Sequence, residues 1–441
     1  MPSSDSSDEA ASRPITGSRG YRPVADYAMI GNTRTVALVA RDGSIDWCCW
    51  PRFDSSAVFC RLLDADKGGS FQVAPVGPSR ATRAYLGPTN VLATTFQTDA
   101  GQIRLTDFMP MRSPESGAAD RPSDAGAAIF RLIEGIAGEV DVEAAFHPTF
   151  DYARATTDLV AAPGGVVARD GRSSATLACP FPLAADSSGR MRGRVRVAVG
   201  DRFWLGLRFS TNGEPESDPI PPVPGDAALA RALGDWERWS AACAYEGPYR
   251  DLVRRGALTL KLLTFAPTGA VVAAPTTSLP ERIGGSRNWD YRFTWLRDSA
   301  LILEALKALG YHQAADEFFS WLRTVWTTHR HHLQIMYTID GDPRLPEEIL
   351  SHLDGYRGSR PVRVGNAAAD QIQLDVYGEV LDAAHFCHDG TCPPDDGLWA
   401  VLASLANRAV ARWREPDRGI WEVRGGPRHF LYSKLLCWVA L

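Results

Sequence analysis

The sequence predicts a protein of two domains, an antiparallel β-sandwich followed by a toroid of helices. The 441 residues exceed the length of one ordinary domain and suffice for two substantial cores. Short apolar runs separated by turn residues fill the chain up to about residue 210, whereas apolar residues at helical spacing dominate from about residue 226. A stretch rich in proline and glycine separates the two patterns, so we expect the domain boundary there.

The composition and the charge limit the partners of the chain. Hydrophobic residues make up 45% and charged residues 22% of the sequence, the ordinary range for a globular protein, and no apolar run reaches the roughly 18 residues that a membrane span needs. A net charge of −5 argues against a surface for nucleic acid or anionic membranes, because such a surface needs clustered basic residues. We therefore expect a small, neutral partner, no nucleic acid and no membrane. The oligomeric state stays open.

Residues 1–20 are predicted to form a disordered tail. The chain begins MPSSDSSDEAASRP, which is acidic and rich in serine. This stretch lacks the apolar core of a secretory signal and is not rich in arginine as a transit peptide is, so we expect a cytoplasmic protein.

Residues 21–210 are predicted to form the β-sandwich. Four turn signals each lie between two apolar runs: Asp42-Gly43, Asp99-Ala100-Gly101, Asp170-Gly171 and Gly200-Asp201. Such turns join antiparallel strands, so each signal predicts a hairpin, and hairpins at these short intervals are typical of a sandwich.

Residues 211–245 are predicted to be a linker with a connecting helix, and residues 246–441 a helical domain. The stretch STNGEPESDPIPPVPGD at 210–226 is too rich in proline and glycine to hold regular structure. Beyond it, apolar residues recur with the helical period. The predicted helices lie within residues 226–243, 249–266, 296–310, 312–326, 367–386, 397–413 and 433–441.

The eight cysteines form no CxxC pair, so reduced and mostly buried thiols are the preferred interpretation. A metal site or a disulfide is the alternative. The stretch HRHH at 329–332 has too few partner residues to indicate a metal site. We therefore expect no metal. The cysteines are residues 48, 49, 60, 179, 243, 387, 392 and 437.

The first of three candidate site loops is GGSRNWDYRFTWLRDSA, residues 284–300, in which aromatic and charged residues alternate. Arg297 next to Asp298 can hold neighbouring hydroxyl groups, because a guanidinium and a carboxylate offer paired hydrogen bonds. Aromatic side chains can cover the apolar C–H faces of a sugar, so the pattern favours a polyol ligand. Alternatively, Asp298 caps a helix and the aromatic residues are core. These residues are Trp289, Tyr291, Phe293 and Trp295.

The second candidate loop, residues 346–380, is irregular and rich in glycine and arginine before it runs into a predicted helix. Gln371 and Asp375 are four residues apart and would share a face of that helix, whereas a surface helix favours Glu–Lys pairs at this spacing. A polar face that lines a pocket is one interpretation, and solvated surface decoration is the other. The polar residues of this helix are Asp370, Gln371, Gln373, Asp375 and Glu379.

The third candidate loop is DRGIWEVRGG, residues 417–426. A carboxyl group beside the ring of Trp421 can have a raised pKa, so Glu422 could stay protonated near neutral pH and donate a proton to a leaving oxygen. The alternative is that Glu422 and Arg424 form an ordinary surface ion pair.

Together the three loops resemble one known family. The ordered motifs TTSLPE, GGSRNWDYRFTWLRDSA, GSRPVRVGNAA, QLDVYGEV and GIWEVRGGPRHFLYSK are similar to those of the bacterial trehalase and glucoamylase branch of family 15 of the glycoside hydrolases. The stretch MIGNTRTVALVARDGSIDWCCWPRFDSSAVFCRLLD resembles the start of the same proteins, so the likeness covers about residues 21–441. It implies an N-terminal β-supersandwich followed by an (α/α)6 barrel.

The resemblance also implies the residues of the site. Trp421-Glu422 matches the acid loop of the family, which makes Glu422 the general acid. The W-x-R-D motif that grips the sugar matches Trp295, Arg297 and Asp298. The remaining substrate-binding candidates are Tyr291, which matches the tyrosine near the transition state, together with Trp421 and Arg424.

The function that the resemblance implies is that of an inverting glycoside hydrolase of an α-glucosidic bond, with trehalose as the first choice of substrate. This chemistry requires no cofactor. The family barrel has twelve helices and its catalytic base follows the acid, whereas about six helices precede Leu441. We therefore expect about half of the barrel, with the base beyond Leu441. The alternatives are a glucoamylase or oligosaccharide α-glucosidase of the same family, and a non-catalytic carbohydrate-binding or scaffold remnant.

Overall fold

The computed structural model describes residues 20–111, 128–211, 219–329, 333–388 and 394–441. The chain divides into two compact units. Unit 1 comprises Met1–Ala241 and Leu353–Ser359, and unit 2 comprises Ala242–His352 and Arg360–Leu441. The predicted tail up to residue 19, two of the histidines of HRHH, Cys392 and part of the proline-rich stretch lie outside the described residues. The predicted division at residues 210 and 245 stays a prediction.

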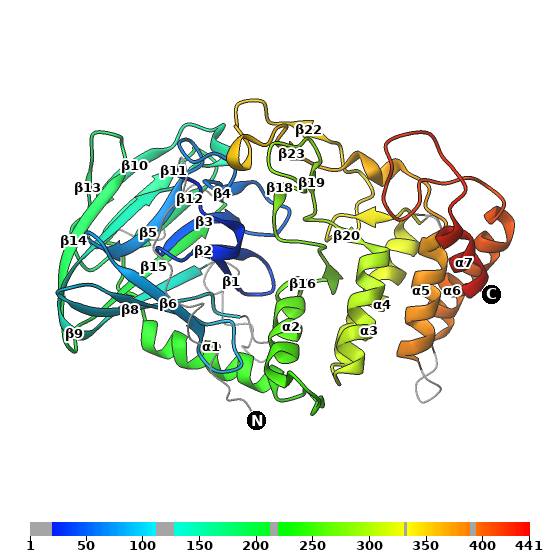
Figure 1. Ribbon diagram of the computed structural model, residues 1–441, viewed down its shortest axis with the longest axis horizontal. Coiled ribbons are helices and arrows are strands. Elements are labelled where there is room, and N and C mark those ends of the chain that lie inside the picture. Colours follow the sequence, from blue (N-terminus) through cyan, green and yellow to red (C-terminus); the bar gives the residue numbers. More distant parts are fainter. Residues whose placement is uncertain (1–19, 112–127, 212–218, 330–332, 389–393) are drawn as a thin grey trace, which may run out of the picture. The chain divides into compact units, whose positions relative to one another are not determined.

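Unit 1 contains a large antiparallel sheet, which confirms the predicted class of its fold (Figure 1). Every strand pair in it is antiparallel. The strands are β1 (Tyr27–Gly31), β2 (Val36–Ala40), β3 (Ser44–Cys49), β4 (Ala57–Phe59), β5 (Ser70–Pro75), β6 (Arg80–Tyr85), β7 (Leu92–Gln97), β8 (Gly101–Phe108), β9 (Ala128–His147), β10 (Asp158–Ala162), β11 (Gly165–Arg169), β12 (Ser174–Ala178), β13 (Ala184–Ala185), β14 (Met191–Ala198) and β15 (Arg202–Ser210).

Three of the four predicted hairpins are present. The turn at Asp42-Gly43 joins β2 to β3, the turn at residues 99–101 joins β7 to β8, and Asp170-Gly171 joins β11 to β12. Gly43 has φ +75°, a conformation that glycine adopts without a steric penalty. The local turn chemistry was therefore sufficient to predict these pairings.

The fourth predicted hairpin, at Gly200-Asp201, is wrong. Its flanking strands do not pair with each other, because both pair with β9: β14 along Glu139–Phe146 and β15 along Ala128–Glu134. β14 and β15 run one after the other along β9, and the turn at Gly200-Asp201 separates them. At this turn the N–H of Gly200 donates to Gly135 O at 3.0 Å. A Cβ on Gly135 would lie 1.8 Å from Ala198 O, so only glycine permits this close approach.

Both parts of the sheet contribute to one hydrophobic core. Val39 and Phe71, from the part of the sheet that joins the second half of β9, belong to the same buried cluster as Phe96 and Leu177, from the part that joins its first half. Inside unit 1, Arg131 on β9 is fully buried and pairs with the buried Asp107 on β8, with Nε donating to Oδ1 at 2.7 Å. The guanidinium also donates to two main-chain carbonyls, Phe71 O and Gly43 O.

Helix α1 (Gly225–Ser240) also belongs to unit 1. Its apolar face, which includes Leu229 and Ala232, packs on Phe130 and Trp204 of the sheet. At Gly225 a Cβ would lie 2.0 Å from the Trp204 ring, so glycine lets the helix start directly on that ring. This contact explains why the chain after the proline-rich stretch returns to the sheet.

Unit 2 contains six α-helices in its described part, which confirms the predicted change to a helical region. Helix α5 packs against α3, α6 and α7, and α4 packs against α3 and α6 (Figure 1). The helices are α2 (Arg250–Leu262), α3 (Leu296–Ala308), α4 (Gln313–Thr328), α5 (Asp375–Cys387), α6 (Asp396–Arg412) and α7 (Leu431–Val439). Short strand pairs in the loops are β16 (Thr264–Phe265) with β17 (Ala270–Val271), β18 (Thr277–Pro280) with β19 (Asn288–Asp290), β20 (Thr294–Trp295) with β21 (Met336–Tyr337) and β22 (Glu348–Ile349) with β23 (Arg363–Val364).

The predicted helix over residues 367–386 is wrong in its first half. The first residues form a 3-10 helix, η5 (Ala367–Asp370). Gln371, the residue after it, has an extended backbone, and α5 begins only at Asp375. The N–H of Leu374 donates to the carboxylate of Asp417 at 2.9 Å, so a residue from a distant loop caps this helix. Gln371 and Asp375 therefore do not share a helical face.

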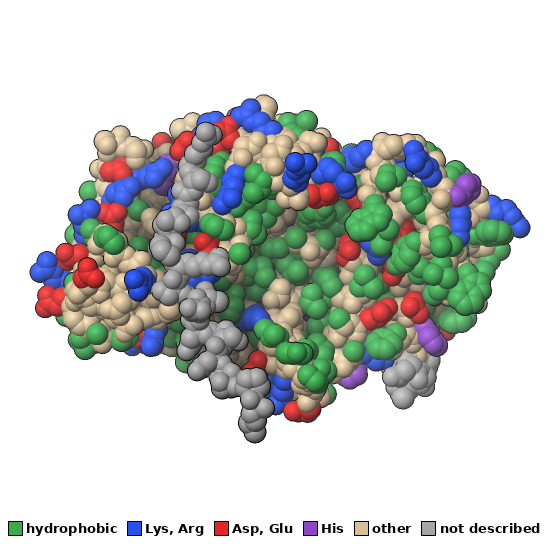
Figure 2. All heavy atoms as spheres, viewed as in Figure 1, with side chains coloured by type: hydrophobic (Ala, Val, Ile, Leu, Met, Phe, Trp, Pro, Cys, Tyr) green, Lys and Arg blue, Asp and Glu red, His purple; other side chains and the backbone are tan. Residues whose placement is uncertain are grey.

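The surface of unit 1 carries acidic and basic side chains next to each other, as Figure 2 shows at the left of the view. On β9 and β14, Arg194 pairs with Glu143 at 2.9 Å and Arg196 with Asp141 at 3.0 Å. Within the described residues, no helix combines the length and the apolar character that crossing a membrane would require.

The buried pair Arg131–Asp107 should be essential for the stability of unit 1. Replacing Arg131 by Met leaves the Asp107 carboxyl buried without its partner, and breaking a buried pair in this way costs about 3–5 kcal/mol. The loss should appear as a lower urea midpoint, measured by tryptophan fluorescence. The control is Arg196→Met, whose pair with Asp141 is solvated and should matter little. Equal midpoints for the two variants would contradict this prediction.

Candidate functional site

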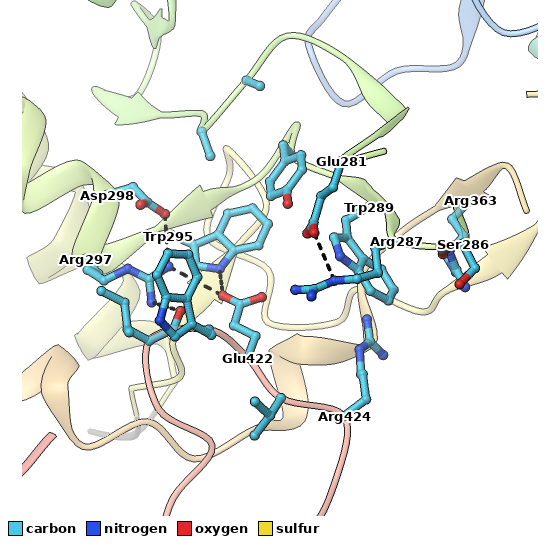
Figure 3. A pocket seen from close by; sticks show the side chains of 16 residues that line it. Glu281, Ser286, Arg287, Trp289, Trp295, Arg297, Asp298, Arg363, Glu422 and Arg424 are labelled. Carbon is cyan, nitrogen blue, oxygen red and sulfur yellow. Dashed lines mark hydrogen bonds and ion pairs between the residues drawn. The ribbon is translucent and has the colours of Figure 1, made fainter. Parts of the chain in front are cut away.

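One cavity in unit 2 brings all seven predicted site residues together. Its volume is about 1020 Å³. Its walls come from the chain around β18 and β19, from the start of α3, from β23 and from the loop at 420–424 (Figure 3). The lining residues are Ala273, Ala274, Glu281, Ser286, Arg287, Trp289, Tyr291, Trp295, Arg297, Asp298, Arg363, Ile420, Trp421, Glu422, Val423 and Arg424.

Glu422 lies in a loop that is closed at its base. The main chains of Asp417 and Arg428 exchange two hydrogen bonds of 2.8 Å. Gly419 has φ +64° and lies against the Phe430 ring, and the N–H of Glu422 donates to Gly419 O at 3.1 Å. The resulting turn gives Glu422 a φ of +51°, a left-handed conformation that is uncommon for a residue with a side chain. The closed loop thereby holds the carboxyl group in the cavity.

The carboxyl group of Glu422 is held by two partners from the start of α3. Trp295 Nε1 donates to Glu422 Oε1 at 2.6 Å, and Arg297 Nη2 lies 3.5 Å from the same oxygen (Figure 3). Burial raises the pKa of Glu422, although Arg297 and the Trp295 hydrogen bond act in the opposite direction. The group therefore keeps its proton to a higher pH than an ordinary glutamate does.

Arg297 is the most connected charge of the site. Its guanidinium lies 3.5 Å from Asp298 Oδ2 and 3.9 Å from Asp375 Oδ2, besides its contact with Glu422. Nη1 also donates to Gln373 Oε1 at 3.1 Å. Burial alone would lower the pKa of Arg297, but the neighbouring carboxylates raise it on balance. Arg297 therefore stays positively charged at any ordinary pH.

Asp298 lies in the first turn of α3 and borders the cavity. The N-cap residue of α3 is Trp295, so Asp298 does not occupy the capping position, and its carboxylate lies beside Arg297. Burial raises the pKa of Asp298, and Arg297 opposes that rise. Beside it, the rings of Tyr291 and Trp295 lie 5.8 Å apart at an angle of 39°. By contrast, Phe293 belongs to a core cluster and does not border the cavity.

The predicted ion pair between Glu422 and Arg424 is replaced by another arrangement. Arg424 Nη2 lies 3.1 Å from Glu347 Oε2, and its guanidinium lies 4.3 Å from the centre of the Trp289 ring. Arg363 lies 4.6 Å from the centre of the same ring and pairs with Glu347 at 3.2 Å. Trp421 is 76% exposed, so overall burial, rather than that ring alone, raises the pKa of Glu422.

Sequence reasoning missed several residues of the cavity. Glu281 pairs with Arg287 at 3.0 Å, and both border the cavity with Ser286 and Arg363. Figure 3 shows the two ends of the cavity: Arg297 and Asp298 lie on one side of Glu422, and Arg287, Trp289 and Arg363 lie on the other. The motifs TTSLPE and GSRPVRVGNAA contain Glu281 and Arg363, but their spacing contains no signal that they meet. The carboxyl group of Glu422 thus lies between two groups of polar and aromatic side chains that line the same cavity.

None of the seven described cysteines lines this cavity. Six of them are buried and Cys387 is half-buried, and none of the seven forms a disulfide. Within the described ranges, no group of three or more His, Cys, Asp or Glu residues is arranged to hold a metal ion.

Comparison with known proteins gives two family matches. Residues 247–441 match the family described as glycosyl hydrolases family 15, and residues 14–182 match the family described as trehalase-like, N-terminal. The chain is 39% identical to a trehalase of Mycolicibacterium smegmatis over 96% of its own length and 65% of that protein. It is 37% identical to a trehalase of Thermoplasma volcanium over 96% and 66% of the two chains. For a trehalase of Thermoplasma acidophilum the identity is 34%, over 91% of this chain and 68% of the relative. The chain thus spans about two thirds of the length of these relatives.

The hydrogen bond from Trp295 should hold down the pKa of Glu422. Replacing Trp295 by Phe removes a donor to the ionised carboxylate, so the pKa of Glu422 should rise further. The measurement is a ¹³C NMR titration of the chain labelled at glutamate Cδ, with the resonance assigned by its loss in Glu422→Gln. Trp289→Phe is the matched control, because the Trp289 ring contacts Arg363 and Arg424 instead. A lower pKa in Trp295→Phe would contradict this account.

Proposed function

Because the chain belongs to family 15 of the glycosyl hydrolases, we propose that its activity is the hydrolysis of trehalose to two molecules of glucose. The observation that carries this proposal is the carboxyl group of Glu422, which has a raised pKa and lies in a cavity with polar and aromatic side chains on both sides of it. The similarity to relatives named as trehalases supports the choice of substrate.

Glu422 is the general acid in this proposal. Its proton passes to the oxygen between the two glucose rings while the bond from C1 to that oxygen breaks. One glucose leaves, and positive charge develops at C1 and the ring oxygen of the other. A carboxylic acid can serve this purpose only while it is protonated, which is the form that burial favours here.

Arg297 and Asp298 bind the ring that carries the developing charge. A guanidinium and a carboxylate 3.5 Å apart present a donor and an acceptor to neighbouring hydroxyl groups. Tyr291 and Trp295 offer ring faces to the apolar side of the sugar. The second glucose occupies the pocket of Trp289, Arg424 and Trp421 beyond Glu422.

The reaction inverts the configuration at C1 in this proposal, with water entering from the face opposite Glu422. The water gives its hydroxyl to C1 and its proton to a second carboxylate, which in inverting enzymes lies roughly 6.5–9.5 Å from the acid. Among the described residues that line the cavity, the other carboxylates are Glu281 and Asp298, and each is paired with an arginine. We assign the base to neither of them. The (α/α)6 barrel and the domain limits proposed from the sequence belong to this same proposal.

A turnover assay separates this proposal from the rival of a non-catalytic carbohydrate-binding remnant. The natural gene product that contains these 441 residues is incubated with trehalose, and glucose release is followed. Binding of trehalose without release of glucose would support the rival. Faster release from maltose than from trehalose would support a glucoamylase.

Replacing Glu422 by Gln should lower kcat by at least about a hundredfold, the scale of general-acid catalysis, and leave KM nearly unchanged. Gln keeps the shape of the side chain but has no proton to give. The matched control is Glu415→Gln, a change of the same kind at an exposed glutamate shortly before the loop. Retained kcat in Glu422→Gln would show that another group protonates the leaving oxygen.

Replacing Arg297 by Ala or Asp298 by Asn should weaken trehalose binding and turnover together. Both residues are proposed to hold the reacting ring, so their loss acts in the ground state and in the transition state. Calorimetry measures the binding and the assay above measures the turnover. Arg344→Ala and Asp342→Asn, in a surface pair at 2.8 Å, are the matched controls. Unchanged calorimetric affinity in both site variants would make these residues merely structural.

A further inference from the structure

Asp375 is a buried carboxyl group that the proposed reaction does not use. It is the first residue of α5 and is 0% exposed. Within the described part of the chain, neither of its carboxylate oxygens accepts a hydrogen bond from another residue. Its charge partner is Arg297, whose Nη1 lies 3.9 Å from Asp375 Oδ2. Burying a carboxyl group without hydrogen bonds from other residues lowers the stability of the fold, so folding alone does not explain its position.

The surroundings of Asp375 are mostly acidic. Glu379 lies on the next turn of α5, and Asp417 comes from the base of the Glu422 loop; both raise the pKa of Asp375. From α7, Tyr432 and Cys437 face the same group. The cation in this shell is Arg297, from α3. Burial is the largest cause of the raised pKa of Asp375, which is about 6.

Arg297 links Asp375 to the cavity. Its Nη1 lies 3.9 Å from Asp375 Oδ2, while its Nη2 lies 3.5 Å from Glu422 Oε1 and 3.5 Å from Asp298 Oδ2. Three carboxyl groups therefore share one positive charge. The charge on any one of them changes the field that the other two experience.

We infer that Asp375 is a positioning residue that acts on Glu422 through Arg297, by neutralising part of the guanidinium charge. When Asp375 is ionised, less positive field reaches Glu422, and Glu422 keeps its proton. When Asp375 is neutral, Arg297 favours the carboxylate form of Glu422. Asp375 does not touch the reacting atoms.

The direction of the effect follows from the charges. Replacing Asp375 by Asn removes a negative charge beside Arg297, so the ionised form of Glu422 becomes more stable and its pKa falls. This shift is opposite to the one expected for Trp295→Phe. In the proposed hydrolase, loss of the acid proton sets the alkaline limb of the pH profile, so that limb should move to lower pH. Only this last consequence rests on the proposed function.

The first experiment measures Glu422 directly and requires no activity. The ¹³C titration of glutamate Cδ is carried out on the wild-type chain, Asp375→Asn and Asp382→Asn. Asp382 is an exposed acid further along the same helix, so its variant is the matched control. We expect the Glu422 midpoint to fall by about one pH unit in Asp375→Asn, the scale of a neighbouring charge, and to stay unchanged in the control. An unchanged or higher midpoint in a folded Asp375→Asn overturns the inference.

The wild-type titration decides the matter if Asp375→Asn does not fold. The Glu422 resonance should then have a second inflection near pH 6, where Asp375 titrates. A single inflection in the wild-type chain overturns the inference.

The second experiment separates this inference from the proposed function. The pH profile of kcat for trehalose hydrolysis is compared between the wild-type protein and Asp375→Asn. An alkaline limb at lower pH by about one unit supports both proposals. A lower Glu422 midpoint in Asp375→Asn, together with no trehalose hydrolysis by the wild-type protein, supports the role of Asp375 and contradicts the proposed function. An active enzyme with identical profiles contradicts the role of Asp375.

Discussion

The site depends on the position of one guanidinium. Arg297 lies within 4 Å of Glu422, Asp298 and Asp375, which belong to three different segments of unit 2. Burial favours the neutral form of each carboxyl group, whereas the guanidinium favours the ionised form. The protonation states of the site follow from this competition. No single carboxyl group can be understood without the other two.

The fold brings these segments together through helix starts and one closed loop. Asp298 and Asp375 lie in the first turns of α3 and α5, where the helix dipole favours a carboxylate. Asp417 closes the base of the Glu422 loop and also accepts the N–H of Leu374 at the start of α5. One buried side chain therefore couples the position of that loop to the position of Asp375.

Local sequence signals predicted the elements and the pairings between strands that adjoin a turn, but not the pairings with distant segments. The turns at Asp42-Gly43 and Asp170-Gly171 predict their hairpins because both paired strands adjoin the turn. The turn at Gly200-Asp201 has the same local chemistry, but β9, more than fifty residues earlier in the chain, decides the pairing. The start of α5 was misjudged for the same reason, because its cap, Asp417, is distant in sequence. The resemblance named residues that do line one cavity, but the partners Glu347, Gln373 and Asp375 depend on tertiary contacts that no spacing reveals.

The backbone of Glu422 has a left-handed conformation, which is unfavourable for a residue with a side chain. A side chain at φ +51° costs roughly 1–2 kcal/mol relative to a right-handed conformation, and glycine would avoid that strain. Glycine would also remove a carboxyl group that is mostly withdrawn from water. The stability of the loop alone therefore does not explain a glutamate at this position.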